Sequence, residues 1–487
     1  MKMYYGNDRM NYCNYTMVTD AYEYTMSNGY LQIGKENVEV VFDVFFRRIP
    51  NGGGYAIMAG VDQVIEFIKN LKYSEDDLQY FKDSGYPDNF IDYLRNFKFT
   101  GTIKAIPDGT PVFPNEPLIT VKAPIIEAQL IETALLSILN GAMSHSTGAR
   151  RIVEACPKGV GVMEFGARRA DGLSAAVDAS IYGLMVGCTG TSNNKAAEML
   201  GKKALGTMAH SWVEAFDTEY DAFLNFAKIY PDNCFLLVDT YNVLKSGIPN
   251  AIKVFEYMRN NNMSLEHIGI RIDSGDIAYL TKEARRMLDE AGFFQCKICI
   301  SNGLKAETIE SLVLQGAKFD LVGVGDNISK PEGNIGCVYK LVAIKDKDDK
   351  YIGKIKLSED TVKIVNPGYK KLYRVYDKDT GYAISDVMCE YDEELSNDEM
   401  VIVSIRDYLK SKKINNYKLC ELQKVIFNDG ILVYNEPDLD EKVIYCEKQM
   451  ATIYPEVKRT LNPHEYYVDG TEKFVLNKRE LIEKLVN

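Results

Sequence analysis

The chain is poor in several residue types that carry common protein chemistry. Its 487 residues include four histidines, one tryptophan and ten cysteines. Ten cysteines over this length are too dilute for a disulfide framework and indicate a reducing compartment. The histidines show neither an HxH nor an HxxxH spacing. The pattern therefore gives no support to a zinc site.

One CxxC pair occurs, Cys296-Lys-Ile-Cys299, within the strand-like run 296–301. Residues three apart on a strand point to opposite faces of the sheet, so the two thiols should not meet. We favour buried core thiols over a metal or redox pair.

Positive charge is also scarce. The net charge is −12, and no cluster of five or more Lys or Arg occurs. Nucleic acids and anionic membranes require a basic face, so neither is an expected partner, although local arginines could still bind a small anion. We expect no apolar stretch that spans a bilayer, and Met1–Asp8 lacks the apolar core of a signal peptide. These features predict a cytoplasmic protein.

Hydrophobic residues make up 46% of the chain, enough for two or three domains. Residues 1–123 alternate helical and strand patterns and predict an α+β domain. The expected elements are a helix over 18–28 closed by Gly29, a strand over 38–47, helices over 62–97 and short strands over 102–121.

Residues 124–345 open with a long helix and then alternate strands and helices. The strand-like segments are 160–165, 184–187, 205–209, 235–239, 268–272, 298–300 and 321–324. Strands recurring about every 20–40 residues with helices between them predict a parallel sheet, here an irregular TIM-like α/β barrel, closed or nearly closed. Residues 346–487 are charged and tyrosine-rich, and we expect a C-terminal extension that packs on the N-terminal domain.

Polar residues and glycines follow these strands, where α/β barrels carry their active sites. The tryptophan lies beside His210 in Gly206-Thr-Met-Ala-His-Ser-Trp212, and we place His210 at the end of a strand. A histidine there could act as an acid, a base or a phosphoryl acceptor, whereas an isolated histidine is more often structural.

The flanking motifs admit both a functional and a structural interpretation. Arg168 and Arg169 suit carboxylates or phosphates, but could instead pair with Asp171. Asp273 and Asp276 could bind ribose hydroxyls or Mg²⁺, or cap a helix. The Gly323-Val-Gly325 turn could expose backbone amides to phosphate, although such a turn is weak evidence alone.

Taken together, these motifs resemble the nicotinate phosphoribosyltransferase family. The matching stretches are Thr19–Met26, Glu164–Arg169, Gly190–Asn193, Gly206–Ser211, Asp239–Tyr241, Arg271–Asp276, Gly323–Gly325 and Val338–Leu341. They run in order over most of residues 15–345, and as a set they are specific.

The resemblance implies ATP-coupled condensation of nicotinate with phosphoribosyl pyrophosphate (PRPP), giving nicotinate mononucleotide and pyrophosphate in NAD salvage. It implies the defective α/β barrel of the nicotinate and quinolinate phosphoribosyltransferases, Mg²⁺ as cofactor, and a homodimer with shared active sites.

The resemblance also assigns roles to residues. His210 would be the phosphorylated histidine, and Arg168 and Arg271 would hold substrate anions. Phe165 and Tyr22 would sandwich the pyridine ring, with Tyr22 donated by the other subunit. The further substrate-binding positions would be Arg169, Ser192, Asp273, Ser274, Gly303, Gly323 and Gly325, with Asp276 near the metal through water or PRPP.

Three positions bear on specificity or depart from the family. The related nicotinamide enzyme carries an aspartate where this chain has Ser192, and a serine can donate to a carboxylate. Ser192 therefore favours nicotinate. Asp326 stands where many relatives have threonine, and Gly303 where they often have an acid.

Three other functions stay open on the sequence. A nicotinamide-preferring phosphoribosyltransferase would have the same fold. A β/α-barrel lyase would use a strand-borne lysine, but none lies at a predicted strand end. A pyridine-sensing protein would bind without turnover.

Overall fold

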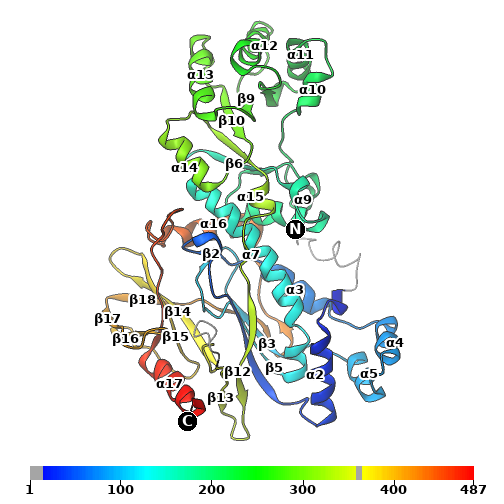
Figure 1. Ribbon diagram of the computed structural model, residues 1–487, viewed down its shortest axis with the longest axis vertical. Helices are drawn as coiled ribbons and strands as arrows, with labels where there is room; N and C mark the ends of the chain where they lie inside the picture. The colour runs from blue at the N-terminus through cyan, green and yellow to red at the C-terminus, as the bar shows by residue number, and fades with distance from the viewer. Residues whose placement is uncertain (1–14, 358–364, 487) are drawn as a thin grey trace. The chain divides into compact units, whose positions relative to one another are not determined.

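The computed structural model describes residues 15–357 and 365–486, which form two compact units (Figure 1). The first contains the chain up to Thr147 together with the chain from Gly333 onward, and the second is Gly148–Glu332. The residues after 345 thus belong with the N-terminal ones.

The second unit is built on a six-stranded parallel sheet of order β7-β6-β11-β10-β9-β8. Its strands are β6 (Gly161–Glu164), β7 (Gly190–Thr191), β8 (Cys234–Leu237), β9 (Ile268–Ile272), β10 (Lys297–Ser301) and β11 (Leu321–Val324). Aliphatic residues fill both faces, as expected for parallel strands covered by helices. In β9, for example, every residue except Arg271 is buried.

This sheet is open, with β7 and β8 at its edges, so it forms a half-barrel and not a closed barrel. The predicted irregular α/β barrel is confirmed, but its ring of seven strands is not closed, because two of the expected strands do not form. Residues 184–187 end a helix, and residues 205–209 are irregular. An apolar run of four or five residues fits a strand or a buried helix end equally well.

Helices flank the half-barrel and end near its loops. They are α8 (Leu173–Met185), α9 (Asn194–Met199), α10 (His210–Glu214), α11 (Glu219–Ile229), α12 (Ile248–Asn260), α13 (Ile277–Glu290), α14 (Ala306–Leu314) and α15 (Asp326–Ser329). Both α12 and α13 pack on β9 (Figure 1). The CxxC thiols Cys296 and Cys299 are buried beside or within β10, as predicted, and burial raises the pKa of Cys299 to about 12.

The first unit contains a seven-stranded sheet of order β13-β12-β1-β5-β3-β19-β20 and the short pair β2–β4. The strands are β1 (Glu39–Phe45), β2 (Ala56–Ile57), β3 (Thr102–Ala105), β4 (Pro111–Val112), β5 (Ile119–Pro124), β12 (Val338–Lys345), β13 (Tyr351–Gly353), β19 (Lys424–Asn428) and β20 (Ile431–Leu432). Strand β1 pairs antiparallel with both β5 and β12, which come from distant parts of the chain.

The helices of this N-terminal region are α2 (Ala21–Gln32), α3 (Val61–Asn70), α4 (Glu75–Asp83), α5 (Asp88–Arg95), α6 (Ile125–Gln129) and α7 (Glu132–Ala155). Gly29 lies inside α2 and does not close it, so that prediction was wrong. The stretch Ile125–Ala155 is long and apolar enough to cross a membrane by length and composition, which we did not anticipate, but 61% of its most apolar window is buried within the protein.

A second antiparallel-rich sheet comes from the C-terminal residues, in the order β17-β16-β21-β15-β14-β18. Its strands are β14 (Lys370–Asp377), β15 (Ala383–Glu390), β16 (Glu399–Ser404), β17 (Ser411–Asn415), β18 (Tyr417–Glu421) and β21 (Val468–Thr471), with α16 (Leu439–Ala451) and α17 (Glu472–Val486) beside it. The sequence indicated few strands here because charged residues such as Lys370 and Arg374 occupy buried positions among the apolar ones.

Buried ion pairs join this sheet to the N-terminal part of the same unit. Arg374 and Asp386 are both 0% exposed and form two hydrogen bonds of 2.8 and 2.6 Å, and Arg374 also donates to the Pro111 carbonyl. Lys370 contacts Asp43 at 2.5 Å. Such pairs hold the segments in register, because removing one partner leaves a buried charge uncompensated.

Candidate active site

Polar side chains gather at the carboxyl ends of β8, β9 and β10 in the half-barrel, and Arg271 organises them. Its Nε donates to Ser301 Oγ at 2.9 Å and its Nη1 donates to Thr207 Oγ1 at 3.0 Å. Its Nη2 lies 3.1 Å from Asp273 Oδ1. The guanidinium is thereby held in one orientation, with 15% of the side chain still exposed to a ligand.

Asp273 links this arginine to the neighbouring loop. Its Oδ1 accepts from Ser301 Oγ at 2.5 Å, and its backbone N–H donates to Asp239 Oδ2 at 3.1 Å. Asp239 Oδ2 also accepts from Ser274 Oγ at 2.6 Å, whereas Asp239 Oδ1 is buried without a partner among the described residues. A buried carboxylate oxygen that lacks a donor is costly and points to a missing ligand.

His210 faces this network. Its Nδ1 is hydrogen-bonded to Thr240 Oγ1 at 3.1 Å, and its Nε2 lies 3.9 Å from Asp273 Oδ2. The prediction that His210 ends a strand was wrong, because it opens the short helix α10 after an irregular segment. The tryptophan anchors this helix, since Trp212 Nε1 donates to the Ala222 carbonyl of α11 at 3.0 Å.

Phe165 forms an aromatic platform beside Arg271, whose guanidinium carbon lies 5.8 Å from the ring centroid. The platform depends on Gly323. A Cβ at that position would lie 2.7 Å from two ring carbons of Phe165, so any side chain there would displace the ring. Gly323 is therefore needed for the close approach of the Phe165 ring. The sequence had suggested a different role, in which the glycine turn exposes backbone amides to phosphate.

Glu164 holds the loop after β6 in place through buried hydrogen bonds. This fully buried carboxylate accepts from Ser180 Oγ at 2.8 Å, from Thr191 Oγ1 at 2.6 Å and from the Gly166 N–H. The Ser192 N–H donates to the Glu164 carbonyl at 3.0 Å, which holds Ser192 next to the platform strand β6. Glu164 was not assigned a role from the sequence, although a buried acid at a strand end is a recognisable signal.

The arginine pair of the 3₁₀ turn Ala167–Arg169 divides into two roles. Arg169 Nε lies 3.4 Å from Asp326 Oδ1, and both side chains are about half exposed. Arg168 is exposed, with no ion pair among the residues that the structure describes. Asp326 therefore has an arginine partner, which accounts for an acid directly after Gly325.

The remaining predicted positions lie at other loop ends. Gly303 follows Asn302 in a turn after β10 in which both residues have positive φ, 85° and 61°. Asp276 is the N-cap of α13 and accepts from the Tyr279 N–H at 3.0 Å. The described residues contain no group of three or more His, Cys, Asp or Glu side chains that could hold a metal ion.

Tyr22 belongs to the first unit, in α2, and is 45% exposed. Desolvation and the nearby Glu132 and Glu23 carboxylates raise the pKa of its phenol well above the usual value. The structure thus groups His210, Arg271, Asp273, Ser274, Phe165 and Gly323 in the second unit and leaves Tyr22 on the first. Asp239, expected from the sequence as a polar residue after a strand, joins the site, and so do Thr207, Thr240 and Ser301, which were not singled out as site residues.

Three segments match models of one family. Residues 17–140 match the nicotinate phosphoribosyltransferase N-terminal domain, 160–346 match the nicotinate phosphoribosyltransferase family, and 369–477 match the nicotinate phosphoribosyltransferase C-terminal domain. The chain is 39% identical over 472 residues to nicotinate phosphoribosyltransferase of Bacillus subtilis, covering 96% of this chain and 95% of the relative.

Solved structures agree. The crystal structure of human nicotinic acid phosphoribosyltransferase superposes with a TM-score of 0.82 at 25% identity, covering 95% of this chain and 99% of that one. A nicotinate-nucleotide pyrophosphorylase from Pyrococcus furiosus shares the fold with a TM-score of 0.69 at 23% identity, over 93% and 98% of the two chains. The chain, with its open parallel half-barrel, belongs to the nicotinate phosphoribosyltransferase family.

Proposed function

We propose that this protein is a nicotinate phosphoribosyltransferase that couples ATP hydrolysis to the condensation of nicotinate with PRPP. In the condensation the pyridine nitrogen forms a bond to C1 of the ribose, and pyrophosphate leaves from the same carbon. The observation that carries the proposal is the network in which Arg271, Asp273, Ser301 and Thr207 converge beside His210.

The pyridine ring would stack on Phe165, with its carboxylate directed toward a basic group. Arg271 lies beside the ring face and is already held by three partners, so its charge is preorganised for an anion. Arg168 and Arg169 would add charge from the turn after β6. Tyr22 would cover the other ring face from a second subunit of a homodimer.

Ser192 would set the choice between acid and amide substrates. Its hydroxyl can donate to a carboxylate, whereas an aspartate would repel it. The nicotinamide-preferring alternative is therefore the less favoured one. A pyridine sensor is also less favoured, because mere binding gives no reason for a histidine held beside the anion site.

His210 would accept the γ-phosphoryl group of ATP and release ADP. Thr240 holds Nδ1, so Nε2 faces Asp273 and the open site. Water would later cleave the phosphohistidine to inorganic phosphate, and this step would drive the condensation forward. The histidine needs a fixed ring orientation to do this, and Thr240 supplies it.

The ribose and phosphates would use the neighbouring loop ends. Asp273 and Ser274 would accept from or donate to the ribose hydroxyls, and the turns at Gly303 and at Gly323–Gly325 would approach the phosphates through backbone amides. Departure of pyrophosphate leaves positive charge at C1, so positioning and charge neutralisation matter more than a strong base.

Mg²⁺ fits this site only as a partner of the substrate. The described residues form no cage of three ligands, but Asp239 Oδ1 is an unpartnered buried acceptor in the loop after β8, and Asp276 lies on the turn after β9. Mg²⁺ keeps several waters and commonly binds through one or two carboxylates plus substrate phosphates, where it neutralises pyrophosphate.

We further propose that the protein is cytoplasmic.

The test is a coupled assay with PRPP and Mg²⁺ that compares nicotinate with nicotinamide, each with and without ATP. We expect turnover of nicotinate, stimulated by ATP. His210→Ala should lose the stimulation, whereas His267→Ala, a histidine outside the site, should keep it.

Preference for nicotinamide would overturn the role of Ser192 and keep the reaction. Absence of turnover with either base would overturn the proposed function. A lyase would instead be trapped by borohydride in the presence of its carbonyl substrate, and we expect no such adduct.

A further inference from the structure

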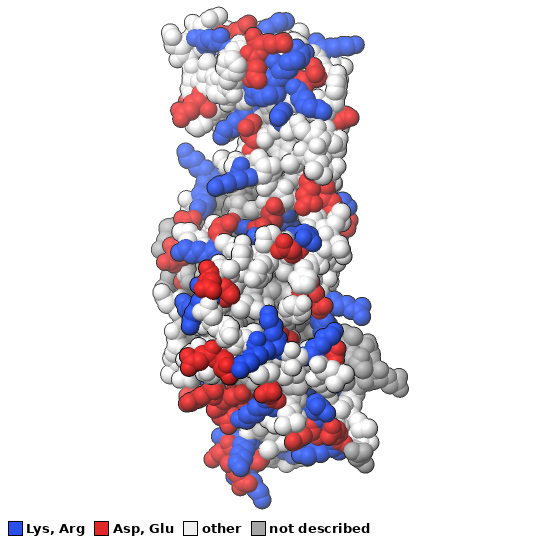
Figure 2. Space-filling model, turned by 90° about the vertical axis from the view of Figure 1, so that its left-hand side faces the viewer, with Lys and Arg blue, Asp and Glu red and all other residues white. Residues whose placement is uncertain are grey.

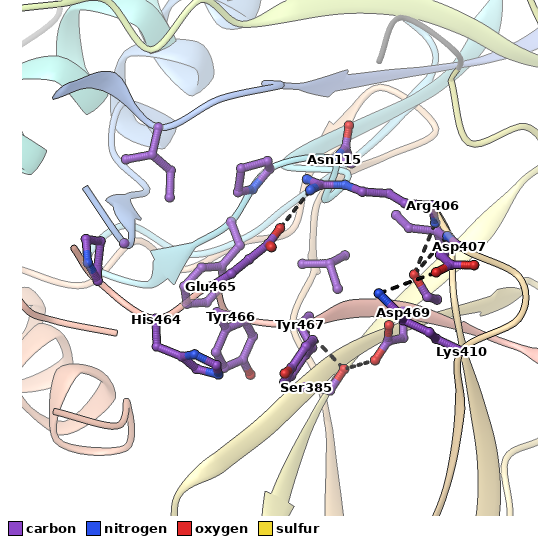
Figure 3. A pocket seen from close by; sticks show the side chains of 18 of the residues that line it. Asn115, Ser385, Arg406, Asp407, Lys410, His464, Glu465, Tyr466, Tyr467 and Asp469 are labelled. Carbon is purple, nitrogen blue, oxygen red and sulfur yellow. Dashed lines mark hydrogen bonds and ion pairs between the residues drawn. The ribbon is translucent and has the colours of Figure 1, made fainter. Parts of the chain in front are cut away.

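The first unit contains a pocket of about 840 Å³ that none of the proposed active-site residues lines. Its walls are the segment after β1, the end of β4, the β16–β17 hairpin and the segment that leads into β21 (Figure 3). The volume falls in the range of sites for small organic ligands. Its lining combines arginine and lysine side chains, aromatic rings and aliphatic side chains.

The floor of the pocket is rigid. Tyr466 stacks on Phe113 with centroids 3.8 Å apart and an interplanar angle of 14°. The Tyr466 hydroxyl donates to Asp386 Oδ1 at 3.0 Å, and Asp386 is in turn held by the buried Arg374. Because each floor group is fixed by a buried partner, the cavity is a built feature of the unit.

The walls are also fixed to each other. A Cβ at Gly54 would collide with the Val457 carbonyl oxygen, so the segment after β1 lies directly against the C-terminal segment. The His464 N–H donates to the Glu456 carbonyl at 2.9 Å, which closes the loop that carries His464 and Glu465. A ligand would meet a preformed shape.

The lining is basic in an acidic protein. Five of its residues are arginine or lysine and three are aspartate or glutamate, whereas the chain carries −12 overall. Arg47 Nε is buried without a hydrogen-bond partner among the described residues. Arg48 and Lys412 are exposed, and neither has a carboxylate at ion-pair distance in the part of the chain that the structure describes. Arg406 pairs with Glu465, Lys410 pairs with Asp407, and Lys412 is an electrostatic neighbour of Asp469, so the lining carries an excess of two positive charges. An excess of this sign favours an anionic ligand.

The face in Figure 2 gives a contrast, because its acidic and basic side chains are interspersed over the surface. A mixed surface of that kind does not attract a large polyanion such as nucleic acid. The pocket volume of about 840 Å³ limits its ligand to a small anion.

Arg406 adds a positive charge whose present partner, Glu465, a ligand could replace. It reaches across the pocket from the β16–β17 hairpin to Glu465, with Nη1 and Oε1 2.7 Å apart (Figure 3). The two side chains are 56% and 71% exposed, and an ion pair so exposed contributes little to stability. A phosphate could take the place of Glu465 on Arg406 at small cost, because guanidinium groups bind phosphate with two hydrogen bonds.

An aromatic surface lies on the same wall. Tyr467 is 55% exposed, and His464 stands nearly perpendicular to it, with centroids 5.8 Å apart. Tyr467 is held through its backbone, since its carbonyl accepts from Ser385 Oγ at 3.1 Å and from the Asp386 N–H at 3.0 Å. Its ring is thus free to stack on a flat ligand. Ser385 also donates to Asp469, which places a carboxylate acceptor beside that ring.

We propose that this pocket is a second, non-catalytic site that binds a nucleotide. The base would stack on Tyr467, the phosphates would contact Arg48, Lys412 and Arg406, and the sugar hydroxyls would face Asp469. The site goes beyond the proposed transferase function, because binding here involves none of the residues beside His210.

The test uses the non-hydrolysable β,γ-imido analogue of ATP, which cannot phosphorylate a histidine. Equilibrium dialysis of the full-length protein counts the bound molecules per chain. An 8-azido ATP photoprobe followed by peptide mapping locates them. We expect two classes of site, one of them labelling the peptide that contains Tyr467.

Two matched pairs of variants sharpen the result. Lys412→Gln should weaken this class roughly tenfold, the scale of a lost charge-assisted hydrogen bond. Lys413→Gln removes the same charge from the adjacent residue of β17, which points to the opposite face, and should leave binding unchanged. Tyr467→Ala should weaken the analogue roughly tenfold through lost stacking, whereas Tyr467→Phe should retain it.

Inorganic tripolyphosphate is the final probe. If it binds as tightly as the analogue and is insensitive to Tyr467→Ala, the pocket is a simple polyanion site and the nucleotide proposal is overturned. The same holds if Lys412→Gln and Lys413→Gln bind alike, or if no label reaches the Tyr467 peptide. Dialysis requires no turnover, so loss of nicotinate turnover with intact binding at this pocket would overturn the proposed function alone.

Discussion

Each of the two units contains an arginine–aspartate pair, and the two pairs have opposite surroundings. Arg374 and Asp386 are completely buried, and their hydrogen bonds go to each other and to neighbouring protein groups. Arg271 and Asp273 are 15% and 26% exposed, and they lie beside His210 and the unpartnered Asp239 Oδ1. The residue types are identical, and Arg374 Nη1 also lacks a partner among the described residues, so exposure and the neighbouring histidine distinguish the reactive pair from the structural one.

The buried pair should give the largest effect on stability. Arg374→Met leaves Asp386 uncompensated, and we expect the free energy of unfolding to fall by about 3–5 kcal/mol. Urea unfolding at pH 7 measures this loss. The double variant Arg374→Met/Asp386→Leu should recover much of it, and a double variant no more stable than the single one would contradict this account.

The exposed pair should give the largest effect on activity with little effect on folding. Arg271→Gln removes the preorganised charge, and we expect kcat/KM for nicotinate to fall about 100-fold or more. The melting temperature should change by only a few degrees. Equal loss of stability in Arg271→Gln and Arg374→Met would abolish the distinction between the two pairs.

Gly323→Ala should have an intermediate effect. The added methyl group displaces the Phe165 ring, so we expect KM for nicotinate to rise about tenfold while kcat changes less. Gly141→Ala is the control, because Gly141 lies in helix α7, outside the site, with open space around it. Unchanged KM in Gly323→Ala would mean that Phe165 is not a platform for the ring.

The smallest effect concerns pH. Desolvation by burial raises the pKa of Glu23 to about 7, against about 4.5 for the unfolded chain. The folded state therefore binds the proton more tightly, and this contribution to stability is present below pH 4.5 and lost as the pH rises through 7. Glu23→Gln should raise the melting temperature at pH 8 by a few degrees and leave it nearly unchanged at pH 4.5. A larger gain at pH 4.5 would contradict the assignment.

The same contrast explains which parts of the fold the sequence predicts. Strands β6, β9, β10 and β11 are aliphatic on both faces, so their runs stand out. The C-terminal strand β14 instead carries Lys370 and Arg374 on the same buried face as Leu372, and these charges hide the pattern. Residues 205–209 carry strand-like residues, but no strand forms there although Leu205 N–H donates to the Thr191 carbonyl of the two-residue edge strand β7, and composition cannot reveal this.

The site follows the same logic. Arg271, Asp273 and His210 could be singled out because charged groups beside glycine turns are unusual. Thr207, Thr240 and Ser301 could not, because hydroxyl residues are common in any loop and acquire meaning only through their distances to Arg271 and His210. Tyr22 would reach the active site only in a homodimer, and the sequence of one chain does not show how two copies assemble.

The buried thiols of the half-barrel have a practical consequence. With a pKa of about 12, Cys299 is a thiolate in only about one molecule in 10⁵ at pH 7, and it is 2% exposed. An alkylating reagent can reach it only when β10 detaches from its neighbours. The rate at which Cys299 is alkylated would therefore measure how often the sheet opens locally. The addition of substrates should slow this alkylation.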